Sequence, residues 1–293
     1  MTVSEKIKNG IGINVLSLCD GMSGGSIALK ELGIKVNNYY SFEIKPYAVQ
    51  VTCLNFSNTI QCGDVNNFDI HMLNDNEIDL FLCGSPCKNM SFINKHTRNG
   101  LKGEKSSLFF KCAEILDIVK PKHFLFENVA SMKNADRDTI SKYLGVQPIK
   151  INASLVSAQL RNRYYWTNIP NVTIPKDKGI KLKDIIDYGS EPEENWSNKK
   201  TEFVNRKIGS TIYFQVDGEK SIPITARGYQ SWNTQFVTDE CGIRDLTIKE
   251  YRRLQTIPDW YDFGNLRKSK ITDLIGDGWC IEVIKHILKN LKD

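Results

Sequence analysis

Residues 14–32 read Asn-Val-Leu-Ser-Leu-Cys-Asp-Gly-Met-Ser-Gly-Gly-Ser-Ile-Ala-Leu-Lys-Glu-Leu, and this stretch decides the fold class. Residues 14–18 predict a short apolar strand, residues 19–25 a glycine-rich turn, and residues 26–32 an amphipathic helix. Glycines let a backbone approach a ligand, and a helix N-terminus favours polar or anionic groups. This order predicts the first unit of a nucleotide-binding type of α/β fold, although many such turns carry glycines for conformational reasons alone.

The next two predicted strands both end near a carboxylate. Residues 39–42 end at Glu43, about 20 residues after the glycine turn, where an acid can bind the hydroxyl groups of a ribose. Residues 59–61 are followed by Asp64, which could accept a hydrogen bond from an adenine amino group. Each acid alone could equally be a helix cap or a loop residue. Because ligands of parallel sheets lie beyond the carboxyl ends of the strands, their recurrence favours a cofactor that contains a nucleoside.

A third apolar run, residues 80–83, enters the turn Gly84-Ser85-Pro86-Cys87. Pro86 restricts the residue before it to an extended conformation, so Cys87 is expected at the tip of a rigid turn, which suits a nucleophile. A cysteine is more often a small buried hydrophobe. The segment after Cys87 favours the catalytic interpretation, since residues 88–111 carry six basic side chains against one acid. Such a run is often only a solvated face, but beside a nucleophile it could bind a phosphate backbone.

The remaining chain predicts the rest of a sheet and a smaller second domain. Helices are expected at residues 106–119 and 136–144, and strands at residues 123–126, 148–152 and 163–167, the last two forming an antiparallel pair because no helix fits between them. From Pro170 to about Gly242 the apolar periodicity fades, and short strands are expected at residues 212–216 and 222–226. A short helix follows at residues 246–254. A C-terminal helix presents Val283, Ile284, Ile287, Leu288 and Leu291 on one face, which should dock on the first domain.

Composition sets further bounds. The 293 residues are 41% hydrophobic and 25% charged, as in an ordinary globular protein, and the net charge of +5 permits a polyanionic partner without requiring one. The N-terminal residues lack an apolar signal segment, and no run approaches the ~18 apolar residues of a membrane span, so we expect a soluble, intracellular protein. Its eight cysteines are expected to be reduced thiols. The chain lacks a Cys-x-x-Cys pair, and its four histidines are scattered, so we expect no metal site.

Over nearly its whole length the chain resembles the DNA cytosine methyltransferases that act on carbon 5 of the base. The matching residues are Asp20-Gly21-Met22-Ser23-Gly24-Gly25, Gly84-Ser85-Pro86-Cys87, Glu127-Asn128-Val129, Gln159-Leu160-Arg161-Asn162-Arg163, and Arg244-Asp245-Leu246-Thr247 with Arg253-Leu254-Gln255 and Pro258. In its compact size the chain is similar to phage and bacterial members and to the catalytic domains of vertebrate de novo enzymes.

The resemblance implies an α/β fold of the Rossmann-like S-adenosylmethionine-dependent methyltransferase type, with a mixed, mostly parallel sheet and a small irregular target-recognition domain. The expected catalytic and cofactor-binding domain is 1–169 plus 270–293, and the expected recognition domain with its hinge helix is 170–269. The implied cofactor is S-adenosyl-L-methionine and the implied partner is double-stranded DNA, with no membrane and no obligate protein partner evident. The implied setting is the cytoplasm of a prokaryotic or phage-infected cell.

The resemblance also implies roles for individual residues. Cys87 would add to carbon 6 of cytosine and make carbon 5 nucleophilic. Glu127 would protonate or hydrogen-bond ring nitrogen 3, and Arg163 would orient the base, with Arg161 also assigned to the catalytic set. The expected cofactor-binding residues are Asp20, Gly21, Met22, Ser23, Gly24, Glu43, Ile44, Asp64, Val65, Pro86, Asp277 and Trp279. The expected DNA-binding residues are Lys88, Asn89, Ser91, Lys95, Arg98, Lys102 and Arg227, of which Arg227 could read a guanine or merely touch phosphate.

Two positions depart from the family pattern, because Cys19 stands where a Phe is usual and Asp277 stands where an Asn is usual. Three alternatives are considered. Transfer RNA cytosine methyltransferases carry Cys-Phe-Thr, and no cysteine of this chain is followed by Phe-Thr. Catalytically silent relatives typically lose the nucleophile or the acid, whereas Cys87 and Glu127 are both present. A nicotinamide-dependent dehydrogenase would explain Glu43 but neither Pro86-Cys87 nor the basic segment.

Overall fold

The computed structural model describes residues 1–86, 101, 108–188, 214–226, 228, 234–239 and 242–293. They form two compact units, and each is described by itself. The first unit comprises Met1–Asn152, Asn162–Pro175 and Val283–Asp293, and the second comprises Ala153–Arg161 and Lys176–Glu282. The predicted domain bounds differ from these units in three places: residues 153–161 belong to the second unit, the first unit extends to Pro175 instead of residue 169, and it resumes at Val283 instead of residue 270.

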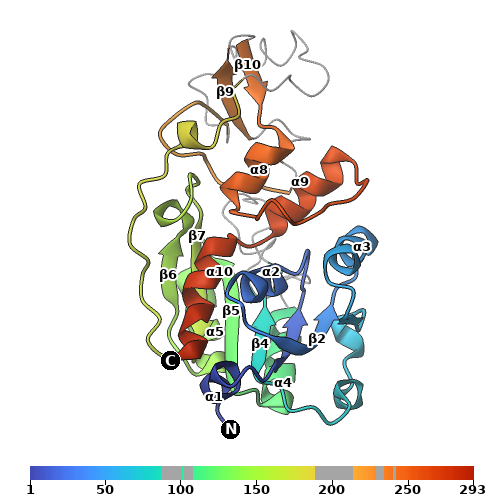
Figure 1. The fold of residues 1–293 in the computed structure, drawn as a ribbon. Coiled ribbons are helices and arrows are strands. Elements are labelled where there is room, and N and C mark those ends of the chain that lie inside the picture. The colour runs from blue at the N-terminus through green and yellow to red at the C-terminus, as the bar shows by residue number, and fades with distance from the viewer. Residues whose placement is uncertain (87–100, 102–107, 189–213, 227, 229–233, 240–241) are drawn as a thin grey trace. The chain divides into compact units, whose positions relative to one another are not determined.

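The first unit is built on a sheet of seven described strands in the order β3-β2-β1-β4-β5-β7-β6 (Figure 1). The strands are β1 (Ile13–Leu18), β2 (Val36–Phe42), β3 (Thr59–Gln61), β4 (Leu80–Cys83), β5 (His123–Val129), β6 (Ile149–Asn152) and β7 (Asn162–Thr167). β1 to β5 pair in parallel, and β7 runs antiparallel to both β5 and β6. The predicted mixed, mostly parallel sheet and its antiparallel closing pair are therefore confirmed.

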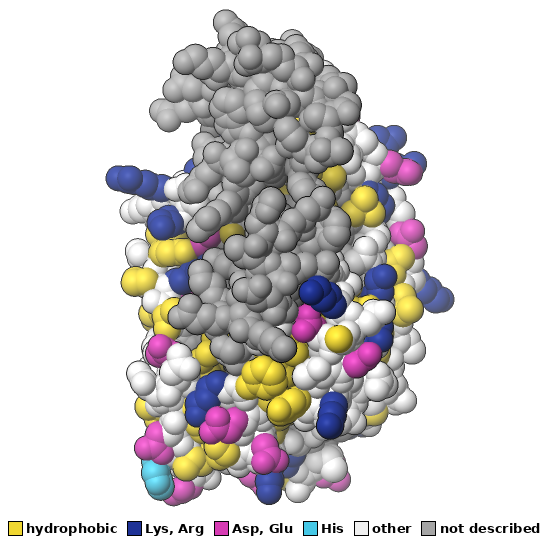
Figure 2. Space-filling view, turned by 180° about the vertical axis from the view of Figure 1, so that it is seen from behind, with side chains coloured by type: hydrophobic (Ala, Val, Ile, Leu, Met, Phe, Trp, Pro, Cys, Tyr) yellow, Lys and Arg dark blue, Asp and Glu magenta, His cyan; other side chains and the backbone are white. Residues whose placement is uncertain are grey.

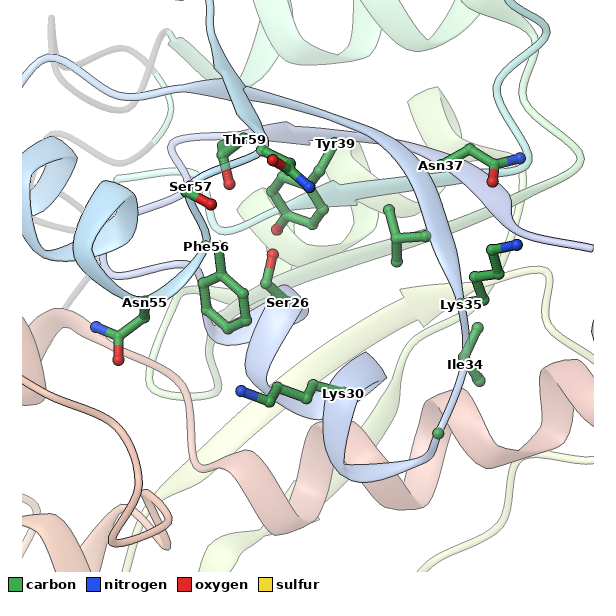
Figure 3. Close-up of a pocket in the computed structure, with 13 residues that line it drawn as sticks. Ser26, Lys30, Ile34, Lys35, Asn37, Tyr39, Asn55, Phe56, Ser57 and Thr59 are labelled. Carbon is green, nitrogen blue, oxygen red and sulfur yellow. The ribbon is translucent and has the colours of Figure 1, made fainter.

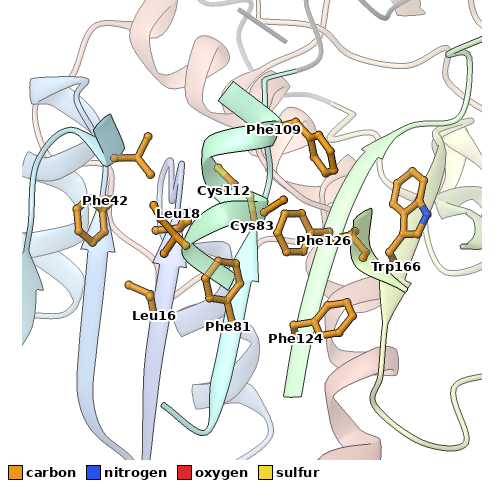
Figure 4. Packing of buried hydrophobic residues seen from close by; sticks show 14 of the residues in the cluster. Leu16, Leu18, Phe42, Phe81, Cys83, Phe109, Cys112, Phe124, Phe126 and Trp166 are labelled. Atoms are coloured by element: carbon orange, nitrogen blue, oxygen red, sulfur yellow. The ribbon is translucent and has the colours of Figure 1, made fainter. Parts of the chain in front are cut away.

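Helices cover both faces of this sheet (Figure 1). The helical elements of the first unit are α1 (Val3–Lys8), α2 (Gly24–Glu31), α3 (Pro46–Asn55), η1 (Val65–Asn67), η2 (Ile70–Leu73), α4 (Leu108–Val119), α5 (Asn134–Leu144), most of α10 (Ile281–Leu288) and η7 (Lys289–Lys292). Successive strand side chains point to opposite faces. Phe81 and Cys83 of β4 accordingly pack in one cluster with Phe109 and Cys112 of α4, while Leu82 lies against α2 on the other face (Figure 4).

The C-terminal helix docks on the first unit as predicted. The five apolar side chains expected to face the core, Val283, Ile284, Ile287, Leu288 and Leu291, are all buried. Polar contacts from this end of the chain reach the C-terminal end of α2, where Lys285 pairs with Glu31 at 3.5 Å and Lys292 donates to the carbonyl oxygen of Leu32 at 2.7 Å. The C-terminus is thus held beside α2.

A buried carboxylate ties the N-terminal helix to the amino end of the sheet. Asp79 accepts hydrogen bonds from the Lys6 ammonium at 2.8 Å, from the Lys122 ammonium at 3.1 Å and from the backbone N–H of Asn14 at 3.0 Å. Burial by itself raises the pKa of Asp79, but these hydrogen bonds outweigh it, so the pKa lies below its ordinary value. The ionised form is therefore stabilised in the folded protein.

We expect Asp79→Asn to lower the free energy of unfolding at pH 7 by about 1.5–3 kcal/mol, the range for a hydrogen bond to a charged group. Because the folded pKa is depressed, this stabilisation is fully present above the unfolded carboxyl pKa of ~3.9 and is lost as the pH falls through the folded value. Urea unfolding from pH 7 to pH 3 should show wild type and variant converging. Glu77→Gln is the matched control, because Glu77 also pairs with Lys122 but its side chain is 77% exposed. A constant gap at all pH values would contradict the account.

The described part of the second unit combines short strands with the α-helices α8 and α9. Its described sheet has the order β10-β9-β8, with β8 (Gln215–Val216) parallel to β9 (Gln235–Asp239) and β10 (Gly242–Asp245) antiparallel to it. The helical elements are η5 (Ala153–Leu155), η6 (Leu182–Asp184), α8 (Ile248–Leu254) and α9 (Lys268–Asp277). A capping box starts α8, since the Thr247 side chain accepts from the N–H of Glu250 while the Glu250 carboxylate accepts from the N–H of Thr247.

The strand predicted at residues 222–226 is wrong. Pro223 lacks an N–H, and the backbone on either side of it binds side chains rather than a neighbouring strand. The N–H of Ile222 donates to Gln235, and the N–H of Ile224 donates to the side-chain oxygen of Gln159. An apolar segment can thus have an extended backbone without pairing with a neighbouring strand, because side chains form the hydrogen bonds to its backbone N–H groups.

Candidate active site

The glycine turn after β1 is organised by Asp20. One carboxylate oxygen accepts from the hydroxyls of Ser17 at 2.5 Å and Tyr39 at 2.8 Å, and the other accepts from the hydroxyls of Ser23 and Ser41. Burial raises the pKa of Asp20, while the four hydroxyl donors oppose that shift. Asp20, predicted to bind the cofactor, is therefore seen to hold the turn on β1 and β2 through its side chain.

The turn also depends on unusual backbone conformations. Cys19, Gly21 and Ser23 adopt left-handed φ angles of 55°, 59° and 56°, which favour glycine. The Ser23 hydroxyl donates to Asp20 and lies 3.0 Å from the Thr52 hydroxyl of α3, contacts that compensate the strain. Gly25 is required for another reason, because a Cβ there would lie 2.3 Å from a Leu82 methyl carbon. The first turn of α2 therefore lies close against the sheet.

Glu43, at the end of β2, joins its own strand to the glycine turn. The N–H of Gly21 donates to one carboxylate oxygen, and the N–H groups of Ile44 and Lys45 donate to the other, all at 2.8 Å. A carboxylate has about four acceptor sites, so Glu43 can hold the turn and still accept from a ligand hydroxyl. The neighbouring Ile44 side chain is 69% exposed and offers an apolar surface next to this carboxylate.

Asp64 follows β3 and begins η1, where one carboxylate oxygen accepts from the N–H and the side-chain amide of Asn66. The neighbouring Val65 is buried. Glu43 and Asp64 thus provide carboxylates at the same ends of adjacent strands, with the exposed Ile44 near Glu43. This set of acceptors and apolar surface fits a ribose and a purine ring, and binding of the S-adenosylmethionine nucleoside by these residues stays a prediction.

We expect Glu43→Ala to weaken S-adenosylmethionine binding about ten- to a hundredfold, because a hydrogen bond to a charged group contributes about 1.5–3 kcal/mol. Calorimetry measures this directly. Asp69→Ala is the matched control, since Asp69 also caps a short helical turn after β3, by accepting from the N–H of His71, but was not predicted to bind the cofactor. Binding by Glu43→Ala within twofold of wild type would remove Glu43 from the cofactor site.

The ends of β4 and β5 lie side by side, and Asn128 joins them. Cys83 of β4 pairs with Phe126 of β5. Beyond that pair, the Asn128 side-chain amide donates to the carbonyl and hydroxyl oxygens of Ser85 at 3.2 and 3.1 Å. Asn128 therefore holds the backbone at Ser85, which precedes Pro86 and Cys87 in the sequence. Sequence reasoning assigned no role to Asn128, although a buried amide beside a catalytic acid at a strand end was a usable signal.

An ion pair joins Glu127 of β5 to Arg163 of β7. The guanidinium Nε lies 2.8 Å from a Glu127 carboxylate oxygen, and both side chains are largely buried. Neighbouring strands fix this contact, because Val129 pairs with Arg163 and Glu127 pairs with Tyr165 in the antiparallel register. The structure therefore brings together two residues predicted to be catalytic, beside the turn that leads to Cys87.

The other predicted site residues lie elsewhere. Cys87, the seven predicted DNA-binding residues and most of the basic segment lie outside the residues that the structure describes. Arg161 belongs to the second unit, where its guanidinium donates to the backbone carbonyls of Ile224, Gly276 and Gly278. Asp277 and Trp279 also belong to the second unit, Asp277 exposed and Trp279 half-buried. Catalytic or cofactor-binding roles for these residues stay predictions.

Several cysteines in the core of the first unit, or packed against it, have raised thiol pKa values. The hydrogen bond with Cys112 and, to a smaller extent, burial raise the pKa of Cys19 well above its ordinary value. Burial raises the pKa of Cys83, which lies near Cys112 (Figure 4). Burial likewise raises the pKa of Cys62 to about 11. Because the thiolate is the nucleophile, these thiols are poorly reactive at neutral pH. The nucleophilic role of Cys87 stays a prediction.

A cavity of about 480 Å³ opens at the other end of β2, where α2 leads into β2 and α3 leads into β3 (Figure 3). Its lining includes Lys30, Lys35, Tyr39 and Phe56, with the Lys30 ammonium 5.8 Å from the centre of the Phe56 ring. Because cofactors of such sheets bind at the carboxyl ends of the strands, this cavity is distinct from the predicted cofactor site.

Charges on the described surface are mixed. In the view of Figure 2, acidic and basic side chains alternate, without a described patch of one sign. Among the described residues, no group of three or more His, Cys, Asp or Glu side chains could hold a metal ion. Likewise, the described helices include none long and apolar enough to cross a membrane.

The strand order, the glycine turn and the strand-end carboxylates define a Rossmann-like fold of the S-adenosylmethionine-dependent methyltransferase class. The family model for C-5 cytosine-specific DNA methylases matches residues 13–293. The chain therefore belongs to this family. Members of this family use S-adenosyl-L-methionine as their methyl donor.

Similar proteins come from plants and bacteria. The chain is 42% identical over 122 residues to DNA (cytosine-5)-methyltransferase DRM1 of Arabidopsis thaliana, a match covering 38% of this chain and 20% of that protein, so it spans about a fifth of that relative's length. It is 26% identical to type II methyltransferase M.NgoBV of Neisseria gonorrhoeae, over 89% of this chain and 67% of that protein. A mutant of Spodoptera frugiperda DNMT2 has a similar fold, with a TM-score of 0.75 at 20% identity over 96% of this chain and 100% of that one.

Proposed function

We propose that this protein methylates carbon 5 of cytosine in double-stranded DNA through a covalent adduct of Cys87. The observation that carries the proposal is the Glu127–Arg163 ion pair, which lies beside the Ser85–Pro86 turn anchored by Asn128. Cys87 directly follows that turn, so a nucleophile, an acid and a cation are supplied from the ends of adjacent strands. This is the set of groups that activation of a cytosine ring requires.

The residues would act in a fixed order. The Cys87 thiolate forms a bond to carbon 6, and Glu127 donates to ring nitrogen 3, which takes up the electron pair released into the ring. Arg163 keeps the Glu127 carboxyl in place and binds the carbonyl oxygen of the base. S-adenosylmethionine supplies the methyl group to carbon 5. A water molecule then takes the carbon 5 proton, the electron pair of that C–H bond re-forms the double bond between carbons 5 and 6, the thiolate leaves carbon 6, and ring nitrogen 3 returns its proton to Glu127. Because carbon 6 is inaccessible within a stacked duplex, the base must be flipped out of the helix.

DNA is the preferred substrate on two grounds. The relatives at 42% and 26% identity are named as a DNA methyltransferase and a type II methyltransferase, whereas the likeness to DNMT2 is one of fold at 20% identity. The chain also lacks the Cys-Phe-Thr sequence associated with transfer RNA methylation. A cytoplasmic role in DNA modification, as in restriction-modification systems, follows from the bacterial relatives and is part of this proposal.

The substrate is tested by incubating the protein with S-adenosylmethionine labelled in its methyl group and with either duplex DNA or transfer RNA. Incorporation into DNA as 5-methylcytosine is expected, with little label in RNA. Cys87→Ser should abolish incorporation, which excludes a contaminating enzyme. Label in transfer RNA but not in DNA would refute the DNA preference and favour an RNA methyltransferase.

A further inference from the structure

A buried polar cluster joins four segments of the second unit. We call Ser157, Gln159, Arg161 and Gln255 the polar hub; each is at most 5% exposed. The Gln159 side-chain amide donates to the carbonyl of Leu254 and to the side-chain oxygen of Gln255, both at 3.1 Å. Its own side-chain oxygen accepts from the N–H of Ile224 at 2.9 Å. Such a satisfied network specifies one arrangement of the segments that it joins.

The hub terminates helices α8 and α9 of the second unit. The last carbonyls of a helix have no partner within it and need donors from elsewhere. At the end of α8 the Leu254 carbonyl accepts from Ser157 and Gln159. At the end of α9 the carbonyls of Gly276 and Gly278 accept from Arg161 at 3.0 and 2.9 Å, where a cation also suits the helix dipole.

Arg161 also holds the segment packed against α9. Its other guanidinium nitrogen donates to the carbonyl of Ile224 at 3.0 Å. The end of α9 approaches this segment so closely that a Cβ on Gly276 would lie 2.3 Å from the backbone nitrogen of Ala226. Arg161 therefore uses its donors on three carbonyls of its own unit, which is the arrangement of a structural rather than a substrate-binding arginine.

The chain continues from the hub directly to the catalytic pair. The loop 153–161 leaves the first unit at Asn152 and returns at Asn162, and these two residues pair across β6 and β7. Arg161 is thus the last residue of the second unit before β7, and only Asn162 separates it from Arg163, whose guanidinium lies 2.8 Å from Glu127. A displacement of Arg161 is transmitted to Arg163 through two peptide bonds.

We propose that Arg161 is a positioning residue that sets the placement of Arg163 against Glu127. By fixing the chain before β7 to the polar hub, it links the arrangement of the second unit to the catalytic ion pair of the first. Substrate binding that rearranges the hub would thereby change the alignment of Glu127. This rests on the proposed role of Glu127 and Arg163 in cytosine methylation, and it replaces the direct catalytic role predicted for Arg161.

A double-mutant cycle with Arg161→Lys and Arg163→Lys tests this proposal. An ammonium can keep part of the carbonyl contacts but not the guanidinium fork. We expect Arg161→Lys to lower kcat about tenfold, in the range of couplings between interacting residues, while KM for both substrates stays within about twofold. If Arg161 acts through Arg163, the double variant should be within about threefold of Arg163→Lys alone.

Arg253→Lys is the matched control, because it is the same change in the same unit and the Arg253 guanidinium also donates to a backbone carbonyl, that of Ile185 at 2.8 Å, which is not part of the polar hub. Its kcat should stay near that of wild type. Circular dichroism tests whether each variant is folded. If Arg161→Lys does not fold, Arg161→Gln replaces it in the cycle. Losses that multiply in the double variant, or an unchanged kcat for the folded single variant, would overturn the proposal. The cycle uses whichever nucleic acid the wild type methylates, so labelling of RNA would refute the DNA preference alone.

Discussion

Glu127→Gln is expected to lower kcat by roughly 10²–10⁴-fold, the usual contribution of a positioned general acid. The amide keeps the shape of the side chain, but it cannot deliver a proton to ring nitrogen 3, and it loses the charge that binds Arg163 at 2.8 Å. The dissociation constant for S-adenosylmethionine should be within about twofold of that of wild type. Glu127 lies near the end of β5, whereas the carboxylates predicted to bind the cofactor follow β2 and β3. Steady-state methylation assays and calorimetry measure the two quantities.

The matched control is Glu114→Gln, the same change in the same unit. Glu114 pairs with Lys111 at 3.1 Å on α4, and its side chain is largely exposed. Its kcat should be that of wild type. A Glu127→Gln variant that retained more than a tenth of wild-type kcat would exclude Glu127 as the acid of the reaction.

The largest effect on stability is expected for Arg244→Met in the second unit. Both terminal nitrogens of the Arg244 guanidinium lie 2.8 Å from the Glu250 carboxylate, and Nε lies 2.6 Å from Asp239. The hydrogen bonds that Arg244 donates to the Glu250 carboxylate raise the pKa of Arg244 above its ordinary value. Breaking a buried pair by removing one partner costs about 3–5 kcal/mol, because the remaining charge stays buried without compensation.

Lys249→Met is the control for this prediction. Lys249 precedes Glu250 on α8 and pairs with Asp187 at 2.8 Å, but its side chain is 54% exposed. Exposed pairs contribute little, so the urea midpoint should barely change. Equal destabilisation by the two variants would show that burial does not govern the strength of the Arg244–Glu250 pair.

Local signals predicted the sheet well. Residues 59–61 and 80–83 were predicted as strands with the bounds of β3 and β4, because turn residues delimit both segments. The carboxylates after β2 and β3 could likewise be placed, since parallel strands bring their carboxyl ends to one edge. What the local pattern could not show is the direction of the Asp20 side chain, which depends on hydroxyls of the neighbouring strand β2.

Two features were not predicted from the sequence, one because its local pattern is weak and one because it depends on long-range contacts. Helix α9 was missed because Gly276 and its charged residues weaken the pattern, although Ile271, Leu274 and Ile275 have helical spacing and are buried. The contacts of Arg161 were also unpredictable, because its acceptors at Gly276 and Gly278 are more than a hundred residues away. Arg161 and Arg163 belong to the same sequence motif. In the folded protein, however, Arg161 contacts backbone carbonyls of the second unit, whereas Arg163 contacts Glu127 of the first.

Trapping on DNA that contains 5-fluorocytosine tests the covalent mechanism most directly. Fluorine at carbon 5 cannot leave as a proton does, so a reaction that begins with attack by Cys87 should stop at an adduct that survives denaturing electrophoresis. Wild type, and Cys53→Ser with its exposed thiol on α3 replaced, should both form this adduct with S-adenosylmethionine present, whereas Cys87→Ser should form none. An adduct with Cys87→Ser as abundant as that of wild type would contradict the assignment of Cys87 as the nucleophile.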